Sequence, residues 1–221
     1  MTKTGEAARP ELELDTDSLL DTLKRRQREI TVAVVAVVAI AGSAYLWRES
    51  VIKKEQRAEQ ALNSASNSYY SGNKALAQSD LEKVVDRYSG TTAAAQGVML
   101  LSQILYENAK WDDGIKRLEA MKGAATGRFG ASIEALIADG YADQKKYDDA
   151  AKHYAAAAEK AEFPVDKDLY RAEVARAMTL GGKRQEARKI WADLASRPDS
   201  PAVGEAKIRL GELEASSDAK P

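Results

Sequence analysis

The sequence of 221 residues contains no cysteine and a single histidine. The absence of cysteine excludes disulfide bonds, thiolate nucleophiles and cysteine-ligated zinc or iron–sulfur centres. A single histidine excludes metal sites that need several histidines, including the HExxH motif. The 33 basic and 34 acidic side chains nearly cancel, so no net positive charge attracts nucleic acid. We therefore predict no enzyme activity, no cofactor, no metal and no nucleic-acid partner.

Helix-disrupting residues are also scarce, since five prolines and 14 glycines stand against 40 alanines. Alanine is the strongest helix former, whereas glycine and proline are the weakest. The sequence has no glycine-rich phosphate-binding loop and no GxSxG motif. The composition predicts an all-α fold, and the length is sufficient for one domain with appendages.

Charge is absent from the 18 residues between Ile30 and Trp47. As a helix this segment would be about 27 Å long, close to the ~30 Å hydrocarbon core of a bilayer. Tyr45 and Trp47 at its end match the aromatic residues found at membrane interfaces. We predict a transmembrane helix over 30–47. A buried core helix is the alternative, although such a helix seldom lacks polar residues on every face.

The flanking charges indicate the orientation of this helix. A dense basic cluster precedes it, whereas the basic residues that follow are equally numerous but more widely spread: Lys24, Arg25, Arg26 and Arg28 against Arg48, Lys53, Lys54 and Arg57. The positive-inside rule then places residues 1–29 in the cytoplasm and the rest of the chain outside it. A cleaved signal peptide is the alternative, because Ala39-Ile40-Ala41 resembles a cleavage site. The long acidic region before the apolar run, and its continuation to Trp47, argue against cleavage.

Two helix boundaries follow from local signals. Ser18 and Asp21 have the spacing of a capping box, which predicts a helix that begins near Ser18 and runs into the membrane segment. Residues 1–14 show no apolar period, and we expect them to be disordered. No glycine or proline lies between Gly42 and Gly72. We therefore expect one helix to leave the membrane and continue into the next domain.

Four segments of similar sequence recur with a period of 36 to 37 residues. Each predicts a turn followed by a helix, and their last residues are the small ones Ala77, Gly114, Ala150 and Ala187. Four residues later stand Leu81, Leu118, Tyr154 and Trp191, and three further on Val84, Met121, Ala157 and Leu194. Eight or nine residues before the small residue stand Tyr69, Tyr106, Tyr141 and Met178.

This pattern predicts a helical hairpin repeated four times over about residues 58–197. The small residue lets the second helix approach the first, and the large residues fill the groove between hairpins that must stack to bury their apolar faces. Pro164, Pro198 and Pro201 fall between hairpins, where helices end. We expect a capping helix over 202–213. The predicted domains are 1–29 (cytoplasmic), 30–47 (transmembrane), 48–215 (helical repeats) and 216–221 (flexible tail).

The turns WDDG, YDDA and RQEA, each with a small residue before large apolar ones, resemble tetratricopeptide repeats (TPR). The order of a basic head, one membrane helix and TPR-like repeats resembles bacterial inner-membrane ancillary subunits of the Sec translocon. That resemblance implies an α-solenoid in the periplasm, and as partners the translocon subunits, periplasmic chaperones and unfolded exported chains. Related TPR domains also occur in envelope scaffolds that coordinate cell-wall or cell-division proteins, and this is the alternative function.

Several polar residues have structural interpretations. His153 is the single histidine and the sequence has no cysteine, which favours a helix residue over a metal ligand. The pairs Asp112-Asp113 and Asp148-Asp149 share one repeat position at a helix N-terminus, where acids complement the helix dipole. Trp111 and Tyr147 also share one position, which indicates packing.

The resemblance to TPR domains implies binding through the face lined by the first helix of each hairpin. Met99 and Gln103 replace the lysine and asparagine that some TPR domains use to grip a chain terminus. A face of aromatic, methionine and amide side chains suits diverse apolar segments, although each of these residues could instead pack between hairpins. The candidate protein-binding residues are Tyr69, Tyr70, Gln96, Met99, Gln103, Tyr106, Glu107, Asp139, Asp143 and Arg176.

Overall fold

The computed structural model describes residues 25–122 and 128–218. The helix expected near Ser18 and the segment 1–14 lie outside the described residues. The chain divides into two units, Met1–Ile52 and Lys53–Pro221, and each is described by itself.

The described part of the first unit belongs to helix α2, which runs without interruption from Gln27 to Tyr70. The unbroken helix expected between Gly42 and Gly72 is confirmed. Its N-terminal part is long and apolar enough to cross a membrane, and none of that apolar stretch is buried. The side chains of Val35, Ile40 and Trp47 are 62%, 68% and 71% exposed. These side chains are therefore not part of a hydrophobic core formed by the described residues.

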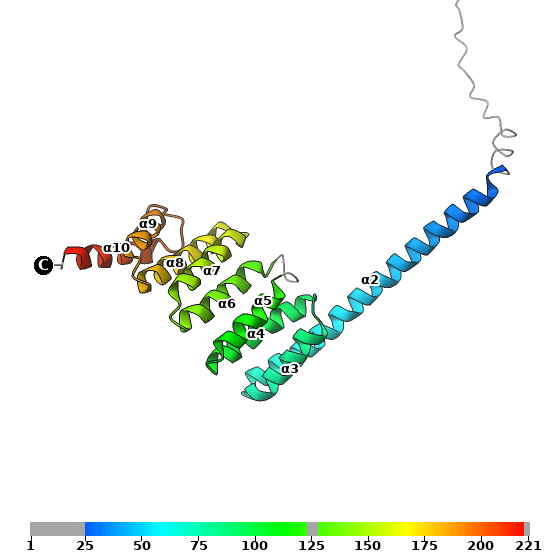
Figure 1. The fold of residues 1–221 in the computed structure, drawn as a ribbon, viewed down its shortest axis with the longest axis horizontal. Helices are drawn as coiled ribbons and strands as arrows, with labels where there is room; N and C mark the ends of the chain where they lie inside the picture. Colours follow the sequence, from blue (N-terminus) through cyan, green and yellow to red (C-terminus); the bar gives the residue numbers. More distant parts are fainter. Residues whose placement is uncertain (1–24, 123–127, 219–221) are drawn as a thin grey trace, which may run out of the picture. The chain divides into compact units, whose positions relative to one another are not determined.

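The second unit is a stack of antiparallel helices that follow one another in sequence order (Figure 1). The described residues form helices and no strand, which confirms the all-α solenoid fold. The C-terminal half of α2 is followed by α3 (Lys74–Arg87), α4 (Thr92–Glu107), α5 (Trp111–Met121), α6 (Gly130–Asp143), α7 (Tyr147–Lys160), α8 (Pro164–Leu180), α9 (Arg184–Ala195) and α10 (Val203–Asp218).

Each of the four predicted turns has the same backbone geometry. In each turn one residue has a positive φ: Gly72 (86°), Ala109 (56°), Lys145 (60°) and Gly182 (82°). Each of them stands five positions before the small residue of its repeat. At the first turn, Gly72 N–H donates to Tyr69 O (3.0 Å) and Asn73 N–H donates to Ser68 O (2.9 Å), and the same pair of bonds recurs at the other three. These are the bonds of a Schellman motif, which ends a helix by satisfying its last carbonyl groups.

The repeat register is confirmed by burial. The small residues Ala77, Gly114, Ala150 and Ala187 are all buried. The large residues that follow are buried as well, with exposed fractions from 0% for Leu81 and Leu118 to 7% for Tyr154. Apolar side chains from the end of α2, from α3 to α5 and from α6 form one core cluster, which continues into smaller clusters around Tyr154 and Trp191.

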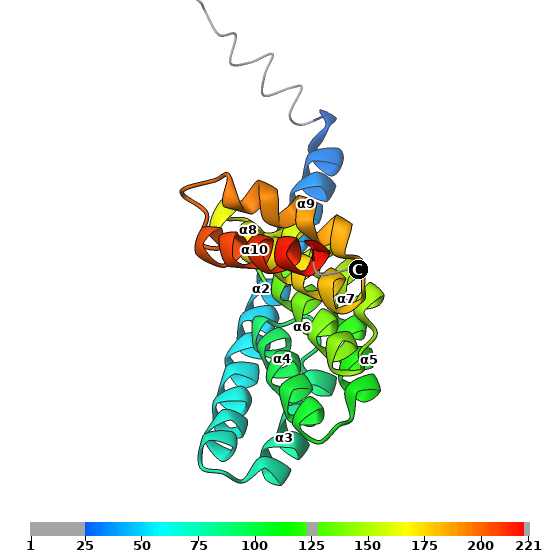
Figure 2. The ribbon, with the colours of Figure 1, turned by 90° about the vertical axis from the view of Figure 1, so that its left-hand side faces the viewer.

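The prolines and the last helix close the solenoid. Pro164 stands in the first turn of α8, where its missing N–H costs nothing. Pro198 and Pro201 lie between α9 and α10. Figure 2 looks from the C-terminal end and shows α9 and α10 beside α8. The expected capping helix is present as α10, which extends beyond Leu213 to Asp218 and so enters the segment expected to be a flexible tail.

Candidate functional site

The candidate residues lie on the first helices of the hairpins, from the end of α2 through α4 and α6 to α8. On α4 they follow one face, since 96, 99, 103 and 106–107 are spaced by three and four residues. Their exposure differs, however. Five are exposed and the other five are half-buried. Glu107 is exposed but forms an ion pair, and the exposed candidates outside printed ion pairs are Tyr70, Gln96, Gln103 and Asp143.

The first group joins α2 to the end of α4. Glu107 accepts a hydrogen bond from the Tyr69 hydroxyl (3.2 Å) and forms an ion pair with Lys74 Nζ (2.7 Å). The Lys74 ammonium lies 5.9 Å from the centre of the Tyr69 ring. The Tyr70 ring meets the Tyr69 ring edge-on, 5.5 Å between centres, and stays 80% exposed. Tyr70 is therefore the aromatic side chain of this face that is open to a partner.

Tyr106 packs between helices instead of lining an open surface. A Cβ atom added to Gly114 would come within 2.5 Å of the Tyr106 ring, and one added to Gly140 within 2.5 Å of its hydroxyl oxygen. That hydroxyl donates to Leu136 O (3.0 Å). Burial raises the pKa of Tyr106, and the nearby carboxylates of Asp139 and Asp143 raise it further. The ring thus fastens α4 to α5 and α6, with the two glycines providing its space.

Carboxylates gather in the middle of the face. Asp139 accepts a short hydrogen bond from the Tyr154 hydroxyl (2.5 Å). Burial raises the pKa of Asp139, and the negative charges of Glu173 and Asp143 add to the increase. Burial and the bond to Asp139 likewise raise the pKa of Tyr154. The sequence analysis placed Tyr154 only in the core and did not select Glu173.

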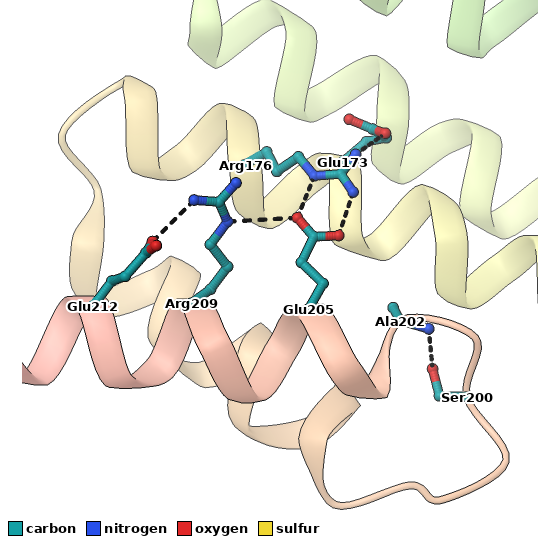
Figure 3. A network of polar contacts seen from close by, with 7 residues as sticks. All are labelled: Glu173, Arg176, Ser200, Ala202, Glu205, Arg209 and Glu212. Carbon is teal, nitrogen blue, oxygen red and sulfur yellow. Dashed lines mark hydrogen bonds and ion pairs between the residues drawn. The ribbon is translucent and has the colours of Figure 1, made fainter.

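Arg176 is the centre of a network that ties α8 to α10 (Figure 3). Its guanidinium donates to both oxygens of Glu205 on α10 and to Glu173 on α8. Arg209 on α10 also donates to Glu205 (3.5 Å) and to Glu212 (2.9 Å). Of these residues only Arg176 was a candidate, because no sequence signal links α10 to α8.

The structure therefore connects most candidates in one row. The negative charges of Asp139 and Asp143 raise the pKa of Tyr106. The charge of Glu173 in turn raises the pKa of Asp139, and Glu173 forms an ion pair with Arg176. Glu107 follows Tyr106 in the sequence and extends the row to Tyr69 and Lys74. Met99 is half-buried and packs against the hydrophobic core. Such a row offers hydrogen bonds, charge and apolar contact to a bound chain.

The residues given structural interpretations have structural partners. His153 Nδ1 lies 2.8 Å from Glu134, and the imidazole stacks on Tyr141. Asp112 accepts a bond from Gln144 (3.0 Å), so this helix-start acid also links neighbouring hairpins. Within the described residues no group of three or more His, Asp or Glu has the geometry to hold a metal ion.

Comparison with known proteins supports the fold. No protein-family model matches the chain, and no curated protein sequence is significantly similar to it. Among solved structures, the nearly identical TPR-like repeats of a kinesin light chain-like protein from Podosopora anserina superpose with a TM-score of 0.59. The match covers 75% of this chain and 89% of that chain at 16% identity, and a single-substitution variant of the same protein gives the same values.

The likeness establishes the fold class, and the chain is a TPR-like α-solenoid. Solenoids of this kind present extended surfaces made by successive repeats, which suits them to protein interaction. The class of protein defined by this fold is thus a TPR-like helical-repeat protein.

Proposed function

We propose that the protein is a single-pass membrane scaffold whose solenoid binds protein segments along the row of first helices. The observation that carries the proposal is the row from Tyr69 and Tyr70 to Arg176, with Tyr70, Gln96, Gln103 and Asp143 exposed along it. The exposed apolar part of α2 supplies the anchor. No covalent chemistry is needed for this role.

The proposed site of action is the bacterial inner membrane, with the solenoid in the periplasm. Its proposed partners are Sec translocon subunits, periplasmic chaperones and unfolded exported chains. Support comes from the order of the parts: a basic head, an apolar helix and TPR-like repeats. Gentle detergent extraction, pull-down through the C-terminus and identification of co-purifying proteins test this. Recovery of cell-wall or cell-division proteins instead would favour an envelope scaffold.

The topology gives a direct prediction. A reporter that is active only outside the cytoplasm should be active when fused after Pro221 and inactive when fused before Ile30, because the basic cluster precedes the apolar segment. The reverse pattern contradicts a periplasmic solenoid. The mass of the membrane-bound protein should show an intact N-terminus, whereas a chain that begins at Gly42 indicates a cleaved signal peptide.

Binding along the first helices can be tested with exposed residues that do not support the fold. The double variant Tyr70→Ala and Gln103→Ala should weaken capture of reduced and alkylated lysozyme at least tenfold, since aromatic anchors dominate interfaces and 1.4 kcal/mol is a factor of ten. Binding is measured by fluorescence anisotropy of the labelled lysozyme.

The matched control is the double variant Lys152→Ala and Gln185→Ala, which changes exposed residues on the second helices α7 and α9. It should capture lysozyme as well as the parent does. Equal weakening by both variants, or by neither, would place the binding face elsewhere. Helix content and the unfolding midpoint, measured in parallel, should be unchanged in all variants.

A further inference from the structure

A cavity of about 330 Å³ lies between α8, α9 and α10, apart from the row of candidate residues except at Arg176. Its apolar wall is formed by Leu180, Trp191 and Leu213, and Thr179 adds a short side chain. Three guanidinium groups and one carboxylate complete the lining: Arg176, Arg184, Arg209 and Glu212. The cavity is mainly apolar, with charged groups from α8, α9 and α10 around it.

The cavity lies beside a repeat position whose side chain changes along the chain. The next-to-last residue of the first helix is Tyr69 in the first hairpin and Tyr106 in the second, but Ala142 and Thr179 in the third and fourth. The Tyr106 ring fills the space between α4, α5 and α6, against Gly114 and Gly140. Thr179 bonds only to Ala175 O of its own helix (2.7 Å), and its side chain is too short to fill the corresponding space. An opening therefore remains between α8, α9 and α10.

Trp191 lines the cavity with its ring, while its indole nitrogen is buried. Trp191 is 1% exposed, and its indole Nε1 is one of two buried side-chain nitrogen or oxygen atoms in the described residues that have no hydrogen-bond partner. A buried donor without an acceptor costs about 1–3 kcal/mol.

Arg209 and Glu212 form an ion pair at the rim of the cavity, and a ligand carboxylate can replace Glu212 in that pair. Arg209 Nη1 donates to Glu212, whose side chain is 57% exposed and reaches the rim from the same helix (Figure 3). Arg209 is also paired with Glu205, but at 3.5 Å this contact is longer than those that hold Arg176 to Glu205 and Glu173. Since a guanidinium has five N–H donors, Arg209 can bind a second carboxylate or exchange Glu212 for it.

We propose that this cavity binds a small aliphatic carboxylate, with the hydrocarbon against Leu180, Trp191 and Leu213 and the carboxylate on Arg209. The volume is at the lower end of small-molecule pockets, which suits a chain of roughly six to eight carbons. Arg209 selects the carboxylate, because its guanidinium can bind a second carboxylate or exchange Glu212 for it. This ligand site is independent of protein binding along the first helices.

The test is a titration of the full chain in detergent with sodium hexanoate, followed by the NMR signals of the indole N–H groups. The chain has three tryptophans, so the Trp191 signal is assigned by its loss in Trp191→Phe. Hexanoate should shift that signal with saturation and a Kd of about 1 mM, as expected for a ligand of about eight heavy atoms. The signals of Trp47 and Trp111 should not move.

Two substitutions at Arg209 and Glu212 should change the affinity for hexanoate in opposite directions. Arg209→Gln should weaken binding at least fivefold, whereas Glu212→Gln should tighten it because the competing carboxylate is gone. Leu180→Gln should weaken binding with little effect on the fold, since Leu180 is 65% exposed. Hexylamine, which has the same chain and a positive charge, should not bind.

The proposal is overturned if the Trp191 signal is unmoved up to about 20 mM hexanoate, far above the expected Kd. It is also overturned if hexylamine binds equally well, or if neither rim variant changes the affinity. A Kd for acetyl-glycyl-leucine more than tenfold below that for hexanoate would assign the cavity to the C-terminal residue of a polypeptide instead.

Discussion

Gly140→Ala should lower the unfolding midpoint by about 2–12 °C, although it adds a single methyl group. That methyl carbon would lie 2.5 Å from the Tyr106 hydroxyl oxygen, 2.7 Å from Cζ and 2.9 Å from Ile115 Cγ1. The ring has little room to move, because its hydroxyl is bonded to Leu136 O and its other edge meets Gly114. Overpacking of this kind costs about 1–3 kcal/mol, and each kcal/mol shifts the midpoint by about 2–4 °C in a domain of this size.

The control is Gly211→Ala in the exposed part of α10, where an added Cβ meets no atom within 4 Å. There alanine should be neutral or stabilising by up to about 1 kcal/mol, because it is the better helix former. In a Tyr106→Leu background, Gly140→Ala should cost less than in the parent, since the two nearest of the three atoms that it meets are absent. Equal losses in both backgrounds would show that Tyr106 does not occupy the space beside Gly140.

Glu134→Gln should cost about 3 kcal/mol at pH 7 and much less at low pH. The Glu134 side chain on α6 is 5% exposed and is paired with Lys160 Nζ (2.5 Å), His153 Nδ1 (2.8 Å) and Lys122 Nζ (3.1 Å). Burial alone would raise the pKa of Glu134, but the bonds from these three bases outweigh it and lower the pKa from 4.5 to about 2. The charged form is therefore strongly stabilised in the folded protein.

The sign of the pH dependence follows from this lowered pKa. The stabilisation is fully present above the unfolded pKa of 4.5 and is lost as the pH falls through the folded pKa of about 2. Urea unfolding of the parent and of Glu134→Gln should therefore converge, with the difference in unfolding free energy shrinking by more than half between pH 6 and pH 3. Glu159→Gln, at an exposed position of α7, is the control and should show no such convergence. A difference that is constant with pH would contradict the role of this carboxylate.

The repeat register could be predicted from the sequence because its signals are local. Within one hairpin lie a residue of positive φ that ends the first helix, a small residue five positions later, and large residues one and two turns beyond it. Because the hairpins stack, each of them must bury the same face. The same holds for the apolar run of α2, where the absence of charge is sufficient to indicate a helix that can span a membrane.

Only the tertiary structure decided which side chains of the candidate face are open. Tyr70 and Tyr106 lie near the ends of equivalent first helices, yet the first is exposed and the second fills a space that Gly114 and Gly140 leave on neighbouring helices. The bases around Glu134 and the bond from Arg176 to Glu205 also join residues from different helices. The exposure of a side chain, its ion pairs and the cavity beside Thr179 all depend on which side chains of the adjacent helix lie opposite. The sequence pattern within one repeat does not determine these opposing side chains.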